Sequence, residues 1–302
     1  MFQILSKTDW LTVRAYFALL KPRVVSLVTF TAVTGAVLAY FSGYHAPFFS
    51  VFTAIFCIAV GSGAAGALNM YYDRDIDAIM SRTSKRPIPQ GKISPEAALV
   101  FGLVLFALSV LLMELAVNHL SAVLLSVAVF YYSVIYTICL KRSTPQNIVV
   151  GGGAGAFPPM IGWAAVANHI GVESLVLFLI IFLWTPPHFW ALALKNSGEY
   201  EAAGIPMLPV TSGVKATKMQ ILCYSVLLFI TSILPYLLRF SGVTYMIVAF
   251  ILGFVFLYYA INVYLDEKKC MKLFYYSVLY LFLLFGTLIL DAALSTALGM
   301  VI

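Results

Sequence analysis

Nine long apolar stretches constrain the fold of this chain more than any other feature. Each is about 20 residues long, the length at which a helix crosses the ~30 Å hydrocarbon core of a bilayer. Only 10% of the 302 residues are charged, against about 25% in a typical soluble protein. The sequence therefore predicts an all-α membrane protein built as a bundle of about nine transmembrane helices. The stretches cover residues 23–41, 48–70, 97–116, 119–139, 146–167, 173–194, 219–239, 242–264 and 274–298.

Residues 1–22 precede the first stretch. They lack the continuous apolar core and the small-residue cleavage site of a secretory signal. We expect an amphipathic segment that lies on the cytoplasmic membrane surface, with a flexible tail as the alternative. Since no linker divides the remainder, residues 23–302 are predicted to form a single domain.

The basic residues predict the orientation of the bundle. With nine spans, 17 of the 18 lysines and arginines fall on one side, and only Arg239 falls on the other. Basic loops stay in the cytoplasm, so we expect a bacterial inner-membrane protein with a cytoplasmic N-terminus and an outward-facing C-terminus. The same bias accounts for most of the net charge of +6, so no nucleic-acid partner is expected.

Asn69, Asp73 and Asp77 are spaced four residues apart where the second stretch ends. On a helix, steps of four drift by only ~40° and rise about 6 Å, so the three side chains form one row. We call these three residues the ladder. Carboxylate and amide oxygens are ligands for hard cations, and the ladder is therefore predicted to hold Mg²⁺.

A basic run follows the ladder, with Arg82, Lys85 and Arg86 all within nine residues of Asp77. Cations beside metal ligands suit a diphosphate group, whose charge they neutralise. An ordinary charged helix end is the alternative, but it does not explain the regular spacing. Asp75 points about 200° away from Asp73 around a helix, so we expect it to pair with an arginine.

A second polar cluster follows the sixth stretch, on the same predicted face. A histidine within a membrane segment, here His188, indicates a functional site. Lys195 and Glu199 follow it, four residues apart. Trp184 fits either this site or an interfacial aromatic belt.

A third cluster, Lys141 and Arg142, begins the fifth stretch in the string KRSTPQN. These two residues fit a site or simple membrane anchors equally well. Asp291 lies deep in the last stretch, where a carboxylate needs a polar partner on another helix. Three histidines on the outer face fit solvated loops better than contacts to a porphyrin or a metal: His45, His119 and His169.

This combination of residues favours chemistry on a lipid diphosphate. A metal ion and fixed cations would stabilise departing pyrophosphate. Loss of pyrophosphate from an allylic substrate leaves a carbocation, which a membrane cavity protects from water. A transporter is the alternative from another class, but transporter sites tend to lie near the midplane between repeats, and the chain shows no duplicated halves.

The string NMYYDRDIDAIMSRTSKRPIPQG resembles the first aspartate-rich motif of the UbiA superfamily of intramembrane prenyltransferases. Within it, KRSTPQN, GGGAGAFPPMIGW and WTPPHFWALALK are similar to the haem-farnesylating branch. The resemblance covers nearly the whole chain after residue 20. It implies a helix bundle around a central cavity open to the cytoplasmic side. It also implies farnesyl diphosphate and haem B as substrates, haem O and pyrophosphate as products, and haem A synthase as a partner.

The same resemblance implies the roles of the site residues. The ladder would hold Mg²⁺ and act in catalysis with Lys195 and Glu199, while His188 and Trp184 would contact the haem. Many superfamily members carry a second aspartate-rich motif after the sixth span; this chain has none there, so Lys195 is expected to replace a second Mg²⁺. A quinone precursor or another tetrapyrrole is the alternative acceptor, and a non-catalytic haem chaperone the remote one. The diphosphate would be bound by Arg82, Lys85, Arg86, Lys141 and Arg142.

Overall fold

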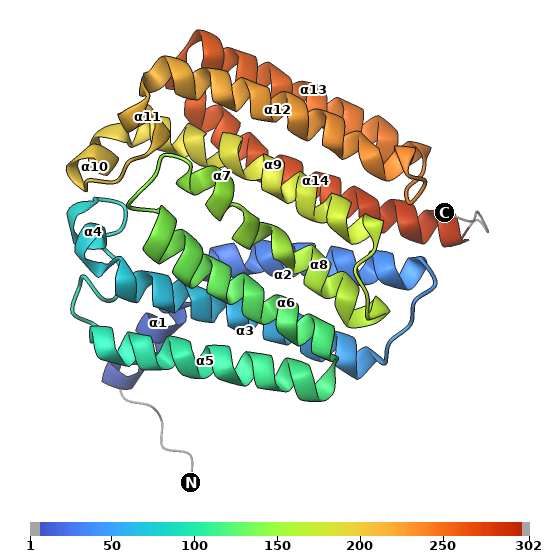
Figure 1. Cartoon of the computed structure of the whole chain (residues 1–302), viewed down its shortest axis with the longest axis horizontal. Coiled ribbons are helices and arrows are strands. Elements are labelled where there is room, and N and C mark those ends of the chain that lie inside the picture. The colour runs from blue at the N-terminus through green and yellow to red at the C-terminus, as the bar shows by residue number, and fades with distance from the viewer. Residues whose placement is uncertain (1–6, 298–302) are drawn as a thin grey trace.

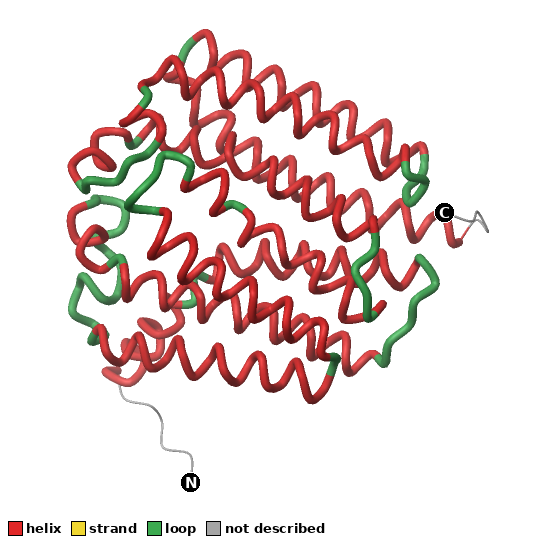
Figure 2. Tube along the Cα trace, in the orientation of Figure 1, coloured by secondary structure: helices red, strands yellow, loops and turns green. Residues whose placement is uncertain are grey.

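The computed structural model describes residues 7–297, and the regular secondary structure of this range is entirely helical, with no β-strand. Nine helices within it are long and apolar enough to cross a membrane, which confirms the predicted fold class. The helices lie side by side (Figure 1), and most connections gather at the two ends of the bundle (Figure 2). The last residue of the ninth predicted stretch, 298, and the first six residues of the chain lie outside the described range.

The helices of the first half follow the predicted stretches closely. Ser94 caps the helix that begins at Pro95 by accepting a hydrogen bond from the Ala97 amide at 3.2 Å. Asn118 caps the helix that begins at His119 by accepting one from the Ser121 amide at 2.8 Å. Both are favoured N-cap residues. The elements are α1 (Lys7–Leu19), α2 (Pro22–Phe41), α3 (Phe48–Tyr72), α4 (Arg74–Ile79), α5 (Pro95–Ala116), α6 (His119–Phe130) and the π-helix η1 (Tyr131–Leu140).

The second half contains two departures from a plain series of spans. The fifth stretch is divided at Gly152 into two helices, and two short helices lie between the sixth and seventh spans. The elements are α7 (Asn147–Gly151), α8 (Gly153–Ala167), α9 (Val172–Lys195), α10 (Ser197–Ala202), α11 (Leu208–Thr211), α12 (Gly213–Leu237), α13 (Val243–Leu265), the 3₁₀ turn η2 (Glu267–Lys269) and α14 (Cys270–Ala297).

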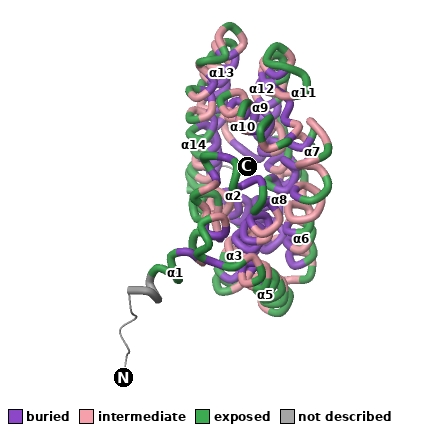
Figure 3. The backbone as a smooth tube through the Cα atoms, turned by 90° about the vertical axis from the view of Figure 1, so that its left-hand side faces the viewer, coloured by how far each residue is buried: buried purple, intermediate pink, exposed green. Residues whose placement is uncertain are grey.

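The span formed by α7 and α8 lies in the middle of the molecule. Of its apolar window, 78% is buried by protein, a larger share than in any other described span. It packs against α2, α6 and α9, and the buried residues gather between the helices (Figure 3). A bilayer can cover the outward faces of the other spans, whereas this one is enclosed by its neighbours.

α1 packs one face on α3 and leaves the other exposed. Ala15 and Leu19 are buried, whereas Leu11 and Phe17 are 60% and 59% exposed. Exposed apolar residues on a helix beside a membrane are typical of an interfacial segment. The short helices α4, α10 and α11 lie at one end of the bundle and the C-terminus at the other (Figure 1); we call the former the ladder end.

Candidate active site

The ladder is built across the junction of α3 and α4. The helix is interrupted at Asp73, but backbone hydrogen bonds still join the three residues: the Asp73 amide donates to the Asn69 carbonyl at 2.9 Å, and the Asp77 amide donates to the Asp73 carbonyl at 2.8 Å. All three side chains are buried, at 3%, 0% and 2% exposure. The Asn69 amide group donates to the Asp73 carboxylate at 2.7 Å. The four-residue spacing therefore keeps the ladder together even though two helices carry it.

Each ladder residue contacts at least one cation, and three of these cations come from different connecting segments. Lys21, between α1 and α2, lies with its Nζ 2.6 Å from Asn69 Oδ1. Lys141, after η1, forms a salt bridge with Asp73. Arg86, after α4, lies 2.6 Å from an oxygen of Asp77.

The cations at this end lose some of their basicity. Burial, together with the charges of Arg86 and Lys141, lowers the pKa of Lys21 to about 7. Burial likewise lowers the pKa of Lys141, although Asp73 opposes that shift. Three cations held close together repel one another, so the ladder end favours an anion.

Asp75 pairs with an arginine, as predicted. Both guanidinium donors of Arg142 reach its carboxylate oxygens at 2.7 Å, and this hydrogen bonding lowers the pKa of Asp75 to about 2. The pair is thus ionised at neutral pH. Arg142 also lies over the ring of Tyr72 and 3.7 Å from Asp73, so Asp75 orients a cation beside the ladder.

The π-helix η1 brings further groups to the ladder. The Lys141 amide donates to the Tyr136 carbonyl five residues back, which is the hydrogen-bond pattern of a π-helix. π-helical turns are frequent at functional sites. Thr137 accepts a hydrogen bond from the Asn69 amide group at 3.1 Å. The hydroxyl of Tyr132 accepts one from Lys21 at 3.3 Å.

Sequence reasoning missed three of these residues: Lys21, Tyr132 and Thr137. Lys21 was used only to predict the orientation of the bundle in the membrane, because a basic residue before the first span is common. The string YYSVIYT, residues 131–137, is unusually polar for a span, and this is the signal that marks Tyr132 and Thr137.

The basic run after the ladder is divided by the structure. Arg86 contacts Asp77, whereas Arg82 is exposed and lies beside the hydroxyl of Tyr200. Lys85 is exposed on the loop. Thr83 donates to the Asp77 carbonyl at 3.1 Å, which ties the loop to the ladder.

Lys195 and Glu199 are separated because α9 ends at Lys195 and α10 begins at Ser197. Glu199 accepts a hydrogen bond from Ser81, in the loop after α4. Lys195 is exposed and lies near Cys270 on α14. No ion pair joins Lys195 to Glu199 or to a ladder residue within residues 7–297. The expected replacement of a second Mg²⁺ by Lys195 stays a prediction.

His188 and Trp184 face α14. The Nδ1 of His188 and the hydroxyl of Ser277 lie 2.7 Å apart, and the imidazole is stacked between Trp184 and Phe274 with ring centroids 4.3 and 4.5 Å away. The indole of Trp184 donates to the Ser277 carbonyl at 2.7 Å. The interior of the bundle therefore holds both residues rigidly.

The oxygens at the ladder end fit a hard divalent cation. Asp73 Oδ1 and Glu199 Oε2 are buried and accept no hydrogen bond from the described residues, which leaves free lone pairs of the kind that Mg²⁺ prefers. The described range contains no cluster of three His, Cys, Asp or Glu side chains for a metal. A cation here would therefore use an amide oxygen or oxygens of its ligand as well.

The fold and the ladder end together define a polytopic membrane protein with an oxygen-rich, cation-flanked site at one end of its bundle. The family model described as "UbiA prenyltransferase family" matches residues 28–286. The chain belongs to this family, and it is therefore a multi-pass membrane protein.

Individual relatives agree with this assignment. The chain is 97% identical over 302 residues to a protoheme IX farnesyltransferase of Neorickettsia sennetsu, with 100% of both chains covered. Among solved structures it is similar to one of a digeranylgeranylglyceryl phosphate synthase, with a TM-score of 0.77 and 19% identity over 93% of this chain and 98% of the other. It is also similar to a UbiA homolog from Archaeoglobus fulgidus bound to GPP and Mg²⁺, with a TM-score of 0.62 and 15% identity over 91% and 99%.

Proposed function

We propose that this protein transfers a farnesyl group from farnesyl diphosphate to a vinyl group of haem B, which yields haem O and pyrophosphate. The observation that carries the proposal is the ladder, a buried row of two carboxylates and an amide with at least one cation at each residue. The full-length relative with 97% identity supports haem B as the acceptor. The ladder by itself does not distinguish haem B from other prenyl acceptors.

Asn69, Asp73 and Asp77 would hold Mg²⁺, and Glu199, which contacts Ser81 in the loop after α4, would act in the same site. The buried Asp73 Oδ1, which accepts no hydrogen bond from the described residues, supports this placement, as does the Mg²⁺ bound to the Archaeoglobus fulgidus homolog. When bound, the ion would neutralise part of the diphosphate charge and so favour its departure.

The cations around the ladder would bind the diphosphate. Lys141 and Arg86 already lie against the two carboxylates, and Arg142 is oriented by Asp75. Arg82 and Lys85, on the exposed loop, would complete the grip. Fixed positive charges of this kind stabilise the charge that develops on leaving pyrophosphate and need no reorganisation during the reaction.

The bond that breaks joins the first farnesyl carbon to the diphosphate oxygen, which keeps the electron pair. The haem vinyl group attacks the allylic cation and forms the new carbon–carbon bond. Water then adds to the resulting cation on the haem side chain and loses a proton, so a hydroxyethylfarnesyl group replaces the vinyl group. This sequence requires no covalent intermediate with the protein.

His188 would ligate the haem iron, with Trp184 as a stacking support. A His188 tautomer in which Nδ1 donates to Ser277 lets the Ser277 hydroxyl donate to the Phe274 carbonyl, 2.7 Å away. That tautomer leaves a lone pair on Nε2, which is the form of imidazole that binds metals. We further propose that the ladder end faces the cytoplasm of a bacterial inner membrane and that haem A synthase receives the product.

The decisive test is mass spectrometry of haem extracted from cells that lack their own haem-farnesylating activity and express this chain. Haem O is expected in the wild type. Asp73→Asn removes a ladder charge and is expected to lower product formation by about 100-fold or more. Glu201→Gln, which removes an exposed carboxylate of α10, is expected to cost much less.

With pyrophosphate release from farnesyl diphosphate measured alongside on the purified protein, three outcomes are distinct. If pyrophosphate is released from farnesyl diphosphate but haem B is unchanged, the acceptor is another molecule. If neither product forms with the folded wild-type protein, the proposed reaction is wrong. Equal losses in both variants would show that Asp73 has no special role.

A further inference from the structure

Lys21 adopts a backbone conformation that few lysines adopt. It separates α1 from α2 with φ +52° and ψ 59°, in the left-handed region. For a residue other than glycine this conformation is strained, and such residues cluster at functional sites. The bend directs the chain from the membrane surface into the first span and turns the Lys21 side chain toward α3.

Glycines on α3 make room for this bend. A Cβ atom at Gly66 would lie 3.1 Å from the Leu19 carbonyl oxygen and 3.4 Å from two methylene carbons of Lys21. At Gly63 it would lie 2.9 Å from the side chain of Leu20. The Lys21 side chain therefore packs directly against the backbone of α3 at Gly66, about one turn before Asn69.

The ammonium of Lys21 has no carboxylate partner. It donates to Asn69 Oδ1 at 2.6 Å and to the Tyr132 hydroxyl at 3.3 Å, and among residues 7–297 it forms no ion pair. The other two ladder cations, Lys141 and Arg86, each have an aspartate. Lys21 is thus the ladder cation that forms no ion pair, and an anion placed beside it would stabilise its protonated form.

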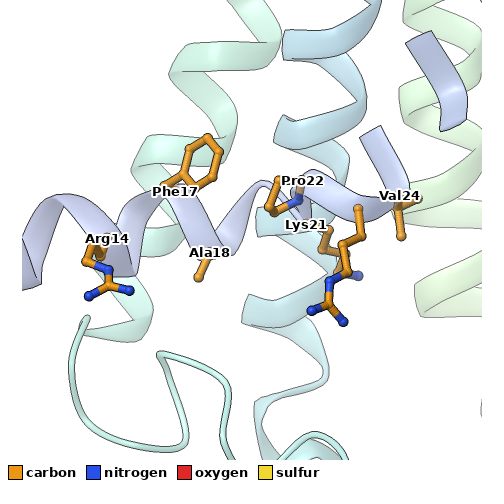
Figure 4. A pocket seen from close by; sticks show the side chains of 7 residues that line it. Arg14, Phe17, Ala18, Lys21, Pro22 and Val24 are labelled. Carbon is orange, nitrogen blue, oxygen red and sulfur yellow. The ribbon is translucent and has the colours of Figure 1, made fainter. Parts of the chain in front are cut away.

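The surroundings of Lys21 are positive as well. Lys21 lines an open hollow of about 400 Å³ together with Arg14 and Arg23 (Figure 4). Neither arginine forms an ion pair in the described part of the chain. An anionic headgroup at the membrane surface therefore meets positive charge before it reaches the ladder.

We infer that Lys21 is a diphosphate-binding residue. In this view its ammonium moves from Asn69 to a phosphate oxygen when the diphosphate binds, and Asn69 Oδ1 is released to serve as a metal ligand. The lone pair of Asn69 Oδ1 that accepts a hydrogen bond from Lys21 cannot coordinate a metal ion at the same time. Departure of the Lys21 ammonium and binding of the ion by Asn69 are therefore compatible steps. The inference rests on the proposed function, since it assumes that the ladder end receives a diphosphate.

The test measures binding to the purified protein in detergent, without catalysis. The probes are inorganic pyrophosphate and a farnesyl thiolodiphosphate that is not hydrolysed, each with and without Mg²⁺. Lys21→Ala is expected to weaken both probes by about tenfold to hundredfold, the usual effect of losing one hydrogen bond to a charged group. Lys21→Arg, which keeps the charge, is expected to retain most of the affinity.

The matched control is Lys92→Ala, which removes an exposed lysine from the loop before α5; its affinity for both probes should equal that of the wild type. Melting temperatures show whether each variant is folded. If the wild type binds pyrophosphate and folded Lys21→Ala binds it equally well, the inference is wrong while the proposed function stands. If the folded wild type binds neither probe, both are wrong.

Discussion

At the scale of single residues, the buried carboxylate of Asp291 acts as a helix cap supplied by another helix. It lies on α14 and accepts hydrogen bonds from the amides of Gly242 and Tyr245, the latter at 3.3 Å. These amides belong to the first turn of α13, whose own N-cap residue, Gly242, has no side chain to accept them. An unsatisfied amide inside a membrane is costly, which explains why a carboxylate is tolerated there. The predicted polar contact across helices is thereby confirmed.

We predict that Asp291→Ala lowers the stability of the protein by about 1–3 kcal/mol, the cost of leaving a buried hydrogen-bonding group unsatisfied. Asp291→Asn retains an acceptor oxygen and should lose less. The measurement is the melting temperature in detergent. Thr287→Ala, a half-buried position on the same helix whose hydroxyl donates to the Leu283 carbonyl, is the control. Equal melting temperatures for Asp291→Ala and the control would contradict the capping role.

At the scale of elements, the sequence predicts where the spans lie but not where they bend. The stretch 23–41 corresponds to α2 within one residue, because hydropathy and span length determine both. The left-handed turn at Lys21 and the π-helix of residues 131–140 depend on contacts with α3. Those contacts join residues 48 and 68 positions apart, so no local pattern reports them. The ladder was predictable because its residues are only four positions apart, whereas the contact between Lys21 and Asn69 joins residues 48 positions apart and was not.

The crossing of α2 and α8 illustrates packing through small residues. A Cβ atom at Gly35 would lie 1.9 Å from the Pro159 carbonyl oxygen, and one at Gly162 would lie 2.0 Å from that of Ala32. Both distances are far below van der Waals contact, so the two helices approach as closely as glycine allows. Close approach through small residues is a principal source of helix association in membranes.

We therefore predict that Gly35→Ala and Gly162→Ala each destabilise the protein by about 1–3 kcal/mol or more through overpacking. Gly155→Ala is a matched control on α8, because a Cβ atom there would meet nothing within 4 Å. It should be neutral or slightly stabilising, since alanine favours a helix by about 1 kcal/mol over glycine. Thermal unfolding of the three variants compares them. A loss at Gly155 equal to that at Gly35 would contradict the packing argument.

At the scale of the whole molecule, the two ends of the bundle differ in charge. Apart from Arg239, the lysines and arginines lie in the N-terminal segment or in and beside the connections that follow the second, fourth, sixth and eighth spans. The contacts of Lys21, Arg86 and Lys141 with the ladder show that these segments meet at one end. A charged diphosphate headgroup does not cross the hydrocarbon core readily, so the side that the ladder end faces determines which compartment supplies the substrate.

The final prediction is that the ladder end faces the cytoplasm, because positively charged loops are retained there. A variant without the four native cysteines would carry a single new cysteine in place of Lys92, at the ladder end, or of His45, in the exposed α2–α3 connection at the other end. A membrane-impermeant maleimide should label His45→Cys in intact spheroplasts and Lys92→Cys only after permeabilisation. Retained haem O formation would show that each variant is folded. The reverse labelling pattern would place the ladder on the outer side, where a cytoplasmic supply of farnesyl diphosphate does not reach it.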